Sequence, residues 1–253
     1  MSGWLAIAGL GPGAPRLITP EVTQALIEAT DLVGYGPYVT RVPARADLTR
    51  HLSDNREELD RANLALRLAA QGKRVVVVSS GDPGVFAMAA AVFEAIDAGE
   101  AAWRDLDIRV LPGISAMFAA AARIGAPLGH DFCAINLSDN LKPWELIERR
   151  LRLAAQADFV MALYNPLSKA RPWQLARAFE LLREELPDSV PVVFASAVSD
   201  PREAIDVVTL RDAAADRADM RTLVLIGSSQ TRLIARTGRP AFVYTPRSAG
   251  AAS

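Results

Sequence analysis

Cysteine and histidine are scarce in this chain of 253 residues, which contains one cysteine, Cys133, and two histidines, His51 and His130. One cysteine excludes an intramolecular disulfide framework and is typical of a protein from a reducing compartment. Two histidines are too few for a metal cluster, so we predict no metal centre. Cys133 lies in an apolar stretch, where a buried thiol is inert, so we do not expect it to act as a nucleophile.

The chain also lacks long apolar runs and an excess of charge. No apolar run is long enough to span a bilayer, and residues 1–13 have neither the basic region nor the cleavage site of a secretory signal. With 28 Lys and Arg against 29 Asp and Glu, the formal net charge of −1 gives no electrostatic field for nucleic acid. We therefore expect a cytoplasmic protein whose partner is neither a membrane nor a nucleic acid.

The chain does contain a regular alternation of short apolar runs and amphipathic stretches, which is typical of an α/β protein. In the first half, Thr19, Pro20 and Glu21 supply a capping residue, a proline and an acid for the first turn of a helix. The expected elements of this half are strands at 4–8, 32–34, 75–78 and 108–111 and helices at 20–29, 54–72, 85–98 and 115–124.

A second α/β unit is expected beyond the Gly- and Pro-rich stretch 125–129, which we interpret as a linker. Its later strands follow one another too closely for a helix in every connection, so part of its sheet should be antiparallel. The expected strands lie at 132–136, 159–163, 190–195, 207–210, 223–226 and 241–244, and the helices at 143–156 and 172–185. The predicted division is an N-terminal domain over 1–126, a C-terminal domain over 127–246 and a disordered tail over 247–253.

Three strands of the first half run into loops rich in glycine and proline. The loops are GLGPG at Gly9–Gly13, SSGDPGVF at Ser79–Phe86 and LPGISAM at Leu111–Met117. GLGPG differs from the dinucleotide fingerprint, because its third glycine comes too early and prolines delay the next helix, which argues against NAD. Asp82 in the second loop carries a negative charge that would repel a phosphate. The alternative role for Asp82 is to cap the following helix. The loops predict a crevice for a nucleoside-like ligand without phosphates, and S-adenosylmethionine fits this description.

The same motifs carry a resemblance to a known family. GLGPG with Thr19-Pro20, Gly34-Tyr35, SSGDPGVF and PGISA occur in the order found in the tetrapyrrole methylases, and the resemblance extends over 4–244. It implies two α/β domains with S-adenosylmethionine in the cleft between them, S-adenosylhomocysteine as product, a tetrapyrrole substrate and a homodimer. The stretches 136–151, 164–171 and 219–232 resemble, within the family, enzymes of cobalamin biosynthesis that methylate ring carbon 17 and contract the ring.

Other functions stay open beside this one. A sibling methylase would act on another ring carbon or on the cobalt-containing intermediate. A binding module would keep the fold without turnover. A NAD-dependent dehydrogenase would need an acid at the end of the second strand, where this chain has Gly34-Tyr35.

The resemblance also implies site residues. The implied cofactor-contacting positions are Pro12, Gly81, Asp82, Val85, Ser115, Ala116, Asn165 and Ala197. Ring contraction requires a proton to leave a ring hydroxyl, so we expect a general base, and the candidates are Asp139, Ser138 and Asp82. For the carboxylate-rich substrate we expect Lys142, Lys169 and Arg171, with Tyr35 and Tyr38 beside the first loop. The alternatives are a helix cap for Asp139, solvated surface charges for the cations and packing for the tyrosines.

Overall fold

The first strands and helices form an α/β unit with a parallel sheet. The structure is a computed structural model, and it describes residues 3–54 and 57–248. Its contacts group the chain into two units, Met1–Ser115 and Ala116–Ser253. The first sheet has the order β3-β2-β4-β1-β5, with β1 Trp4–Gly9, β2 Asp31–Tyr35, β3 Thr49–Ser53, β4 Arg74–Ser79 and β5 Asp107–Leu111. Its helices are α1 Pro20–Glu28, α2 Gly36–Val39, α3 Glu58–Ala70 and α4 Met88–Ala98, with 3-10 turns at Pro15–Leu17 and Ala101–Asp105.

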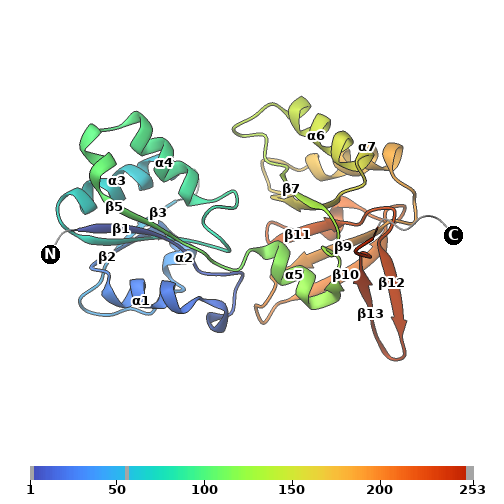
Figure 1. Ribbon diagram of the computed structural model, residues 1–253, viewed down its shortest axis with the longest axis horizontal. Helices are drawn as coiled ribbons and strands as arrows, with labels where there is room; N and C mark the ends of the chain where they lie inside the picture. The colour runs from blue at the N-terminus through green and yellow to red at the C-terminus, as the bar shows by residue number, and fades with distance from the viewer. Residues whose placement is uncertain (1–2, 55–56, 249–253) are drawn as a thin grey trace. The chain divides into compact units, whose positions relative to one another are not determined.

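Helices cover both faces of this sheet (Figure 1). α1 packs on one face through Val22 and Leu26, whereas α3 and α4 pack on the other face through Leu66 and Val92. The neighbouring strands β1 and β4 pair in parallel, and the helices that follow them lie on opposite faces. Such a reversal is a topological switch point, where open α/β sheets bind ligands at the carboxyl ends of their strands.

The helices α1 and α3 confirm the predictions made from capping residues and periodicity. The hydroxyl of Thr19 accepts a hydrogen bond from the Val22 N–H at 3.3 Å at the start of α1. α3 begins later than the predicted start at Asp54, because the Asp54 N–H first bonds the Glu57 carboxylate at 2.9 Å. Residues 55 and 56, which the prediction included in this helix, lie outside the described residues.

The predicted start of α4 at Val85 is wrong, since the helix begins at Met88. Before the helix the chain makes a turn, in which the Val85 N–H donates to the Asp82 carbonyl at 3.3 Å. Phe86 follows with a φ of +52°, a left-handed conformation that a helix cannot contain. The loop SSGDPGVF is therefore longer than its sequence pattern indicates.

The second unit contains the mixed sheet that the close strand spacing predicts. Its order is β10-β9-β11-β8-β7, with β7 Phe132–Asn136, β8 Val160–Tyr164, β9 Pro191–Ser196, β10 Ala204–Thr209 and β11 Thr222–Ile226. β7 and β8 pair in parallel, and the other neighbours pair antiparallel. The helices are α5 Ala116–Ile124, α6 Trp144–Gln156 and α7 Gln174–Glu185, with a 3-10 turn at Ala215–Arg217. A small sheet adds β6 Gly125–Ala126, β12 Arg232–Arg236 and β13 Arg239–Tyr244.

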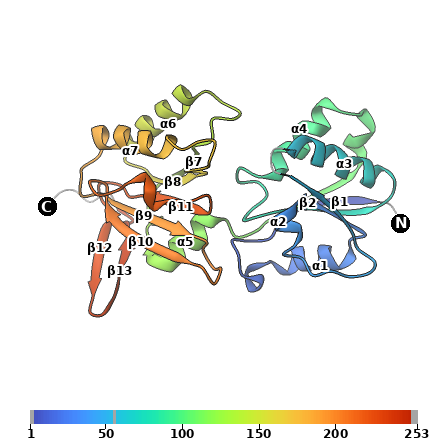
Figure 2. The same ribbon diagram turned by 180° about the vertical axis from the view of Figure 1, so that it is seen from behind.

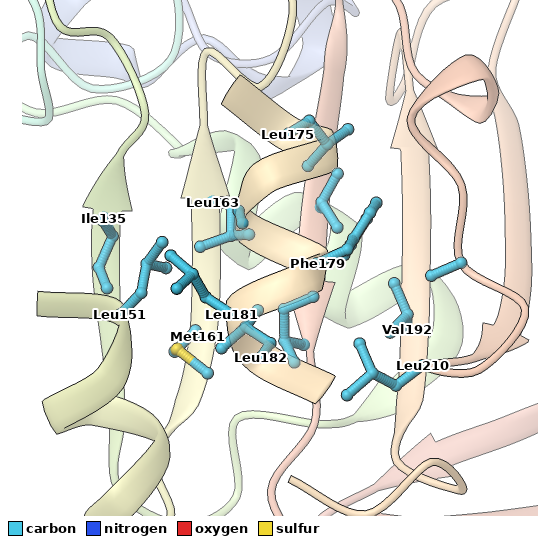
Figure 3. Packing of buried hydrophobic residues seen from close by; sticks show 14 of the residues in the cluster. Ile135, Leu151, Met161, Leu163, Leu175, Phe179, Leu181, Leu182, Val192 and Leu210 are labelled. Atoms are coloured by element: carbon cyan, nitrogen blue, oxygen red, sulfur yellow. The ribbon is translucent and has the colours of Figure 1, made fainter. Parts of the chain in front are cut away.

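The core of the second unit lies between this mixed sheet and the helix pair α6 and α7 (Figure 2). Figure 3 shows Phe179 and Leu175 of α7 among side chains of the sheet, including Leu163 of β8 and Val192 of β9. The rings of Phe179 and Phe194 meet edge to face with centroids 5.9 Å apart. This packing holds β7 and β8 in place, and the loops at their carboxyl ends carry most of the candidate residues of this unit.

Besides the three 3-10 turns, the elements of the described residues that escaped prediction from the sequence are α2, β3, β6 and β12. The stretch predicted as a linker contains β6, and Gly125 and Ala126 pair in parallel with Val243 and Tyr244 of β13. The predicted domain boundary at residue 126 stays a prediction, and the contacts group α5 and β6 with the second unit. Residues 249–253 of the predicted disordered tail lie outside the described residues. No helix in the described part of the chain combines the length and the apolar character that crossing a membrane requires.

Candidate functional site

Three glycines bring the carboxyl ends of β1, β4 and β5 into close contact in the first unit. A Cβ on Gly113 would lie 2.2 Å from the carbonyl oxygen of Gly81, and a Cβ on Gly9 would lie 2.5 Å from the same oxygen. A Cβ contact under 3.0 Å forces a shift, and here the contacted atom is backbone, which has little room to move. Only glycine therefore allows the three loops to meet.

Backbone hydrogen bonds join the loops GLGPG and GDPG. The Gly11 N–H donates to the Gly81 carbonyl at 3.1 Å, and the Gly81 N–H donates back to the Gly11 carbonyl at 2.9 Å. Both residues have positive φ, +65° and +63°, which glycine adopts without strain. The bridge lies at the topological switch point between β1 and β4, with Pro12 directly after it.

The carboxylate of Asp82 ties the second loop to the third. Its Oδ1 accepts a hydrogen bond from the Gly84 N–H at 2.8 Å, and its Oδ2 accepts one from the Gly113 N–H at 3.1 Å. The alternative prediction was that Asp82 caps the following helix. Asp82 instead caps the turn at Gly84, because the helix begins only at Met88. Because both oxygens accept backbone donors, Asp82 positions the loops, and its role as a general base stays a prediction.

Arg41, which was not predicted as a site residue, contacts the first glycine loop. Its guanidinium donates to the carbonyls of Leu10 at 2.6 Å, Gly11 at 3.2 Å and Gly13 at 3.2 Å. Arginine presents several donors in one plane, which suits a row of carbonyls. No local sequence pattern marks Arg41, because it reaches GLGPG from the segment after α2.

The donor set of these loops fits S-adenosylmethionine. The loops offer backbone amides, carbonyls and the carboxylate of Asp82, and the guanidinium of Arg41 is directed at loop carbonyls. A phosphate would need positive charge at this point, whereas a sulfonium nucleoside does not. Val85 lies in the turn after GDPG, and Ser115 is buried at the end of the third loop, with 2% exposure.

Tyr35 and Tyr38 lie at the carboxyl end of β2, with ring centroids 5.3 Å apart in an edge-to-face contact. Burial raises the pKa of Tyr38, as does the nearby Tyr35, while Arg41 and Arg61 act in the opposite direction. The hydroxyl of Tyr38 is therefore a neutral hydrogen-bond donor. Neither hydroxyl hydrogen bonds to another of the described residues.

In the second unit, a polar cluster forms at the carboxyl ends of the parallel strands β7 and β8. Asn136 ends β7, and its Oδ1 accepts hydrogen bonds from the Ser138 N–H at 2.9 Å and the Asn165 Nδ2 at 3.0 Å. Asn136 thereby links the two loops that were singled out from the sequence. It was not predicted, although it opens the quoted stretch 136–151.

Asp139 lies in this cluster, half-buried, with a partner that was also missed. Its Oδ2 accepts a hydrogen bond from the Gln174 side-chain amide at 3.1 Å, and Gln174 is 2% exposed at the start of α7. Oδ1 of Asp139 accepts no hydrogen bond from the described residues. A carboxylate held at one oxygen and open at the other has the arrangement of a proton acceptor.

Lys142 lies near enough to both Asp139 and Arg171 for their charges to affect it. The Lys142 ammonium donates to the Ser138 carbonyl at 2.9 Å, and the Arg171 guanidinium donates to the Asn165 carbonyl at 2.8 Å. Burial lowers the pKa of Lys142, the positive charges of Arg150 and Arg171 lower it further, and Asp139 opposes the shift.

The remaining predicted residues of this unit occupy loop positions. Lys169 is exposed in the turn between Ser168 and Arg171. Asn165 and Ala197 follow β8 and β9 with φ of +50° and +48°, and alanine in this conformation is strained. Ala116 begins α5. The parts predicted for Ala116, Asn165 and Ala197 in cofactor binding stay predictions.

Cys133 lies in β7 and is half-buried. Burial raises the pKa of its thiol to about 11, so the nucleophilic thiolate is disfavoured at neutral pH. This agrees with the prediction that the thiol is inert.

A parallel sheet with glycine loops at its switch point defines an α/β enzyme of the nucleoside-cofactor class. The chain matches the family model of the tetrapyrrole (corrin/porphyrin) methylases over residues 5–214, and it belongs to this family. This match and the solved structures confirm the predicted fold class. The family also confirms the prediction that S-adenosylmethionine is the methyl donor.

Individual relatives cover the chain almost completely. It is 61% identical over 247 residues, 98% of this chain and 97% of the relative, to a precorrin-3B C(17)-methyltransferase of a Sinorhizobium species. It is 47% identical to the cobalamin biosynthesis protein CobIJ of Mycobacterium tuberculosis, of which the match covers 48%.

Solved structures agree with these relatives. The crystal structure of the methyltransferase CobJ matches with a TM-score of 0.92 and 62% identity, over 97% of this chain and 100% of that one. A uroporphyrin-III C-methyl transferase of Thermus thermophilus, complexed with S-adenosylhomocysteine, matches with a TM-score of 0.68 at 24% identity, over 89% of this chain and 97% of that one. The second likeness shows the fold alone.

Proposed function

We propose that this chain methylates carbon 17 of precorrin-3B with S-adenosylmethionine and contracts the ring, giving precorrin-4 in cobalamin biosynthesis. The observation that carries the proposal is 61% identity over nearly all of a relative named for methylation at this carbon. The polar cluster around Asp139 adds support, because ring contraction needs a proton acceptor.

For the methyl transfer, the residues of the chain have a positioning role. When bound, S-adenosylmethionine supplies a methyl group on a sulfonium sulfur, and the sulfur keeps the electron pair of the broken bond. The ring carbon supplies the pair for the new bond, so no side-chain nucleophile is needed. Asp82 and Arg41 fix the glycine loops, and a fixed loop holds its ligand in one orientation and excludes water.

For the ring contraction, Asp139 is the general base of the proposal. Its open Oδ1 takes the proton of a ring hydroxyl, while the Gln174 amide holds Oδ2 and fixes the plane of the carboxylate. Ser138 lies beside it, with its backbone fixed by Asn136 and Lys142.

Cations of the same cluster are proposed to bind peripheral carboxylates of the substrate. Arg171 suits bidentate binding, while Lys142 and the exposed Lys169 offer point charges. The proposal also includes a homodimer, which the family resemblance implies. It includes a cytoplasmic location as well, because the chain has a single cysteine.

A second candidate substrate is the cobalt-containing intermediate. A relative from Salmonella typhimurium, named a probable cobalt-factor III C(17)-methyltransferase, is 38% identical over 90% of this chain. The higher identity to the metal-free-substrate relative favours precorrin-3B.

The test incubates the purified chain with S-adenosylmethionine and either precorrin-3B or cobalt-factor III, without oxygen. The proposal predicts that S-adenosylhomocysteine forms with precorrin-3B, and that carbon NMR of the product shows a new methyl group at carbon 17 and a contracted ring. Turnover of cobalt-factor III alone, or methylation at another carbon, would reject it in favour of a sibling methylase.

A further inference from the structure

The first unit contains a buried arginine that forms no ion pair with an acid among the residues that the structure describes. Arg61 lies in the first turns of α3 and is 5% exposed. Among the described residues it forms no ion pair, although Glu57 and Glu58 lie near enough to affect it. Burial lowers the pKa of its guanidinium, and the two acids oppose this shift without cancelling it. Arg61 is therefore a positive charge in a desolvated position, and within the described part of the chain no carboxylate bonds it directly.

The hydrogen bonds of Arg61 go to neutral acceptors. Nε donates to the Ser53 hydroxyl at 2.7 Å, and one terminal nitrogen donates to the Asp54 carbonyl at 2.8 Å. The other terminal nitrogen points at the thioether sulfur of Met88 at 3.1 Å, and a thioether is a weak acceptor. A guanidinium has five N–H donors, so part of its capacity is unused by the described residues. A neutral amide could join the same elements without the desolvation cost of a charge.

The position of Arg61 is the ligand-binding edge of the sheet. Ser53 ends β3, and Met88 begins α4, where its N–H donates to the hydroxyl of Ser79 at the end of β4. Tyr38 is close enough for Arg61 to affect its pKa, and its hydroxyl has no hydrogen bond to the described residues. Arg61 and Tyr38 thus supply a cation and a neutral donor beside the loop that carries GDPG.

We propose that Arg61 and Tyr38 form a carboxylate-binding subsite for a peripheral acid side chain of the tetrapyrrole. This inference rests on the proposed function, because that function supplies a substrate rich in carboxylates. The bound carboxylate replaces the thioether of Met88 as the partner of the guanidinium and accepts a second hydrogen bond from the Tyr38 hydroxyl. Binding involves no covalent step.

The test replaces the buried charge with an apolar side chain of similar length, Arg61→Met. The matched control is Arg67→Met, which removes an exposed arginine from the same helix. Four quantities are measured: kcat and KM for precorrin-3B, the Kd of S-adenosylhomocysteine, and the Kd of uroporphyrin I, a carboxylate-rich porphyrin, from quenching of tryptophan fluorescence. The proposal predicts that Arg61→Met raises the KM and the porphyrin Kd by about 10- to 100-fold, with kcat and the Kd of S-adenosylhomocysteine within a factor of two. Arg67→Met should leave all four values unchanged.

Unchanged KM and porphyrin Kd in Arg61→Met would overturn the proposal, and so would a loss confined to S-adenosylhomocysteine binding. If Arg61→Met does not fold, the variants Arg61→Lys and Tyr38→Phe are used to test the subsite instead. Each keeps most of the local packing and should weaken porphyrin binding several-fold, and wild-type affinity in both would overturn the subsite. If the wild type does not convert precorrin-3B, the proposed function fails, and uroporphyrin I binding still reports on the subsite by itself.

Discussion

The two units hold their candidate residues in different ways. In the first, backbone groups of three glycine loops meet, and the side chains of Asp82 and Arg41 serve to fix those loops. In the second, side chains bond one another in two pairs: the Asn165 amide donates to Asn136, and the Gln174 amide donates to Asp139. A site built from backbone depends on the absence of side-chain atoms, whereas a site built from side chains depends on their chemistry.

The difference assigns the two parts of the reaction to different kinds of residue. Methyl transfer needs position and the exclusion of water, which rigid backbone loops provide. Ring contraction needs a proton acceptor, which backbone does not provide. Substitutions should therefore separate cofactor binding from proton transfer.

The largest expected effect belongs to Asp139→Asn. The change removes the proton acceptor and keeps the shape, so turnover of precorrin-3B should fall by about 10²- to 10⁴-fold. Affinity for S-adenosylhomocysteine, measured by calorimetry, should not change. Asp131→Asn, at an exposed carboxylate just before β7, is the control and should keep wild-type turnover. Turnover of Asp139→Asn within a factor of two of wild type would remove Asp139 from the mechanism.

Gly113→Ala should act on the other site. The new Cβ would lie 2.2 Å from the Gly81 carbonyl, so the loops must separate, at a cost of about 1–3 kcal/mol in the free energy of unfolding. Affinity for S-adenosylhomocysteine should fall about tenfold or more. Gly36→Ala is the control, because its Cβ would meet nothing nearer than a Leu52 methyl carbon at 3.8 Å. Wild-type affinity in Gly113→Ala would show that the close approach of the loops is not needed for binding.

Gln174→Met tests positioning in the second unit. It removes the amide that holds Oδ2 of Asp139 but fills the same buried space. We expect kcat to fall about tenfold while KM and the Kd of S-adenosylhomocysteine stay near wild type, because orientation and not binding is lost. Gln156→Met, on the exposed side of α6, controls for the loss of an amide. A fall in thermal stability with unchanged kcat would mean that Gln174 is structural.

The last prediction concerns Cys133, whose thiol has no proposed part in the reaction. A pKa of about 11 against 9.0 lowers the thiolate fraction about 100-fold at pH 8, so iodoacetamide should alkylate the folded chain far more slowly than the denatured one. Because the folded pKa is raised, burial of the neutral thiol favours the folded state below pH 9, and this contribution disappears as pH rises through about 11. Equal alkylation rates would show that the thiol is exposed.

The glycine loops of the first unit could be located from the sequence, whereas the side-chain pairs of the second unit could not. Glycine and proline mark a loop locally, so GLGPG, GDPG and PGISA could be placed at strand ends without a structure. The turn before α4 was misjudged, because the left-handed Phe86 has no signal in its residue type.

Contacts between distant segments could not be predicted. Gln174 reaches the loop residue Asp139 from the start of α7, and Arg41 reaches Leu10 from beyond α2. The two residues of each pair are far apart in the sequence, and no local pattern in a single sequence shows that they meet in the fold. The edge strand β3 was missed as well. Its sequence TRHLS has one apolar residue, so it lacks the apolar run by which buried strands are recognised.

The glycine loops are proposed to bind a nucleoside cofactor that has no phosphates. A calorimetric titration of the purified chain with S-adenosylhomocysteine and, separately, with NAD tests this most directly. We expect micromolar binding of S-adenosylhomocysteine and no heat from NAD. Binding of NAD, or no binding of S-adenosylhomocysteine, would contradict it.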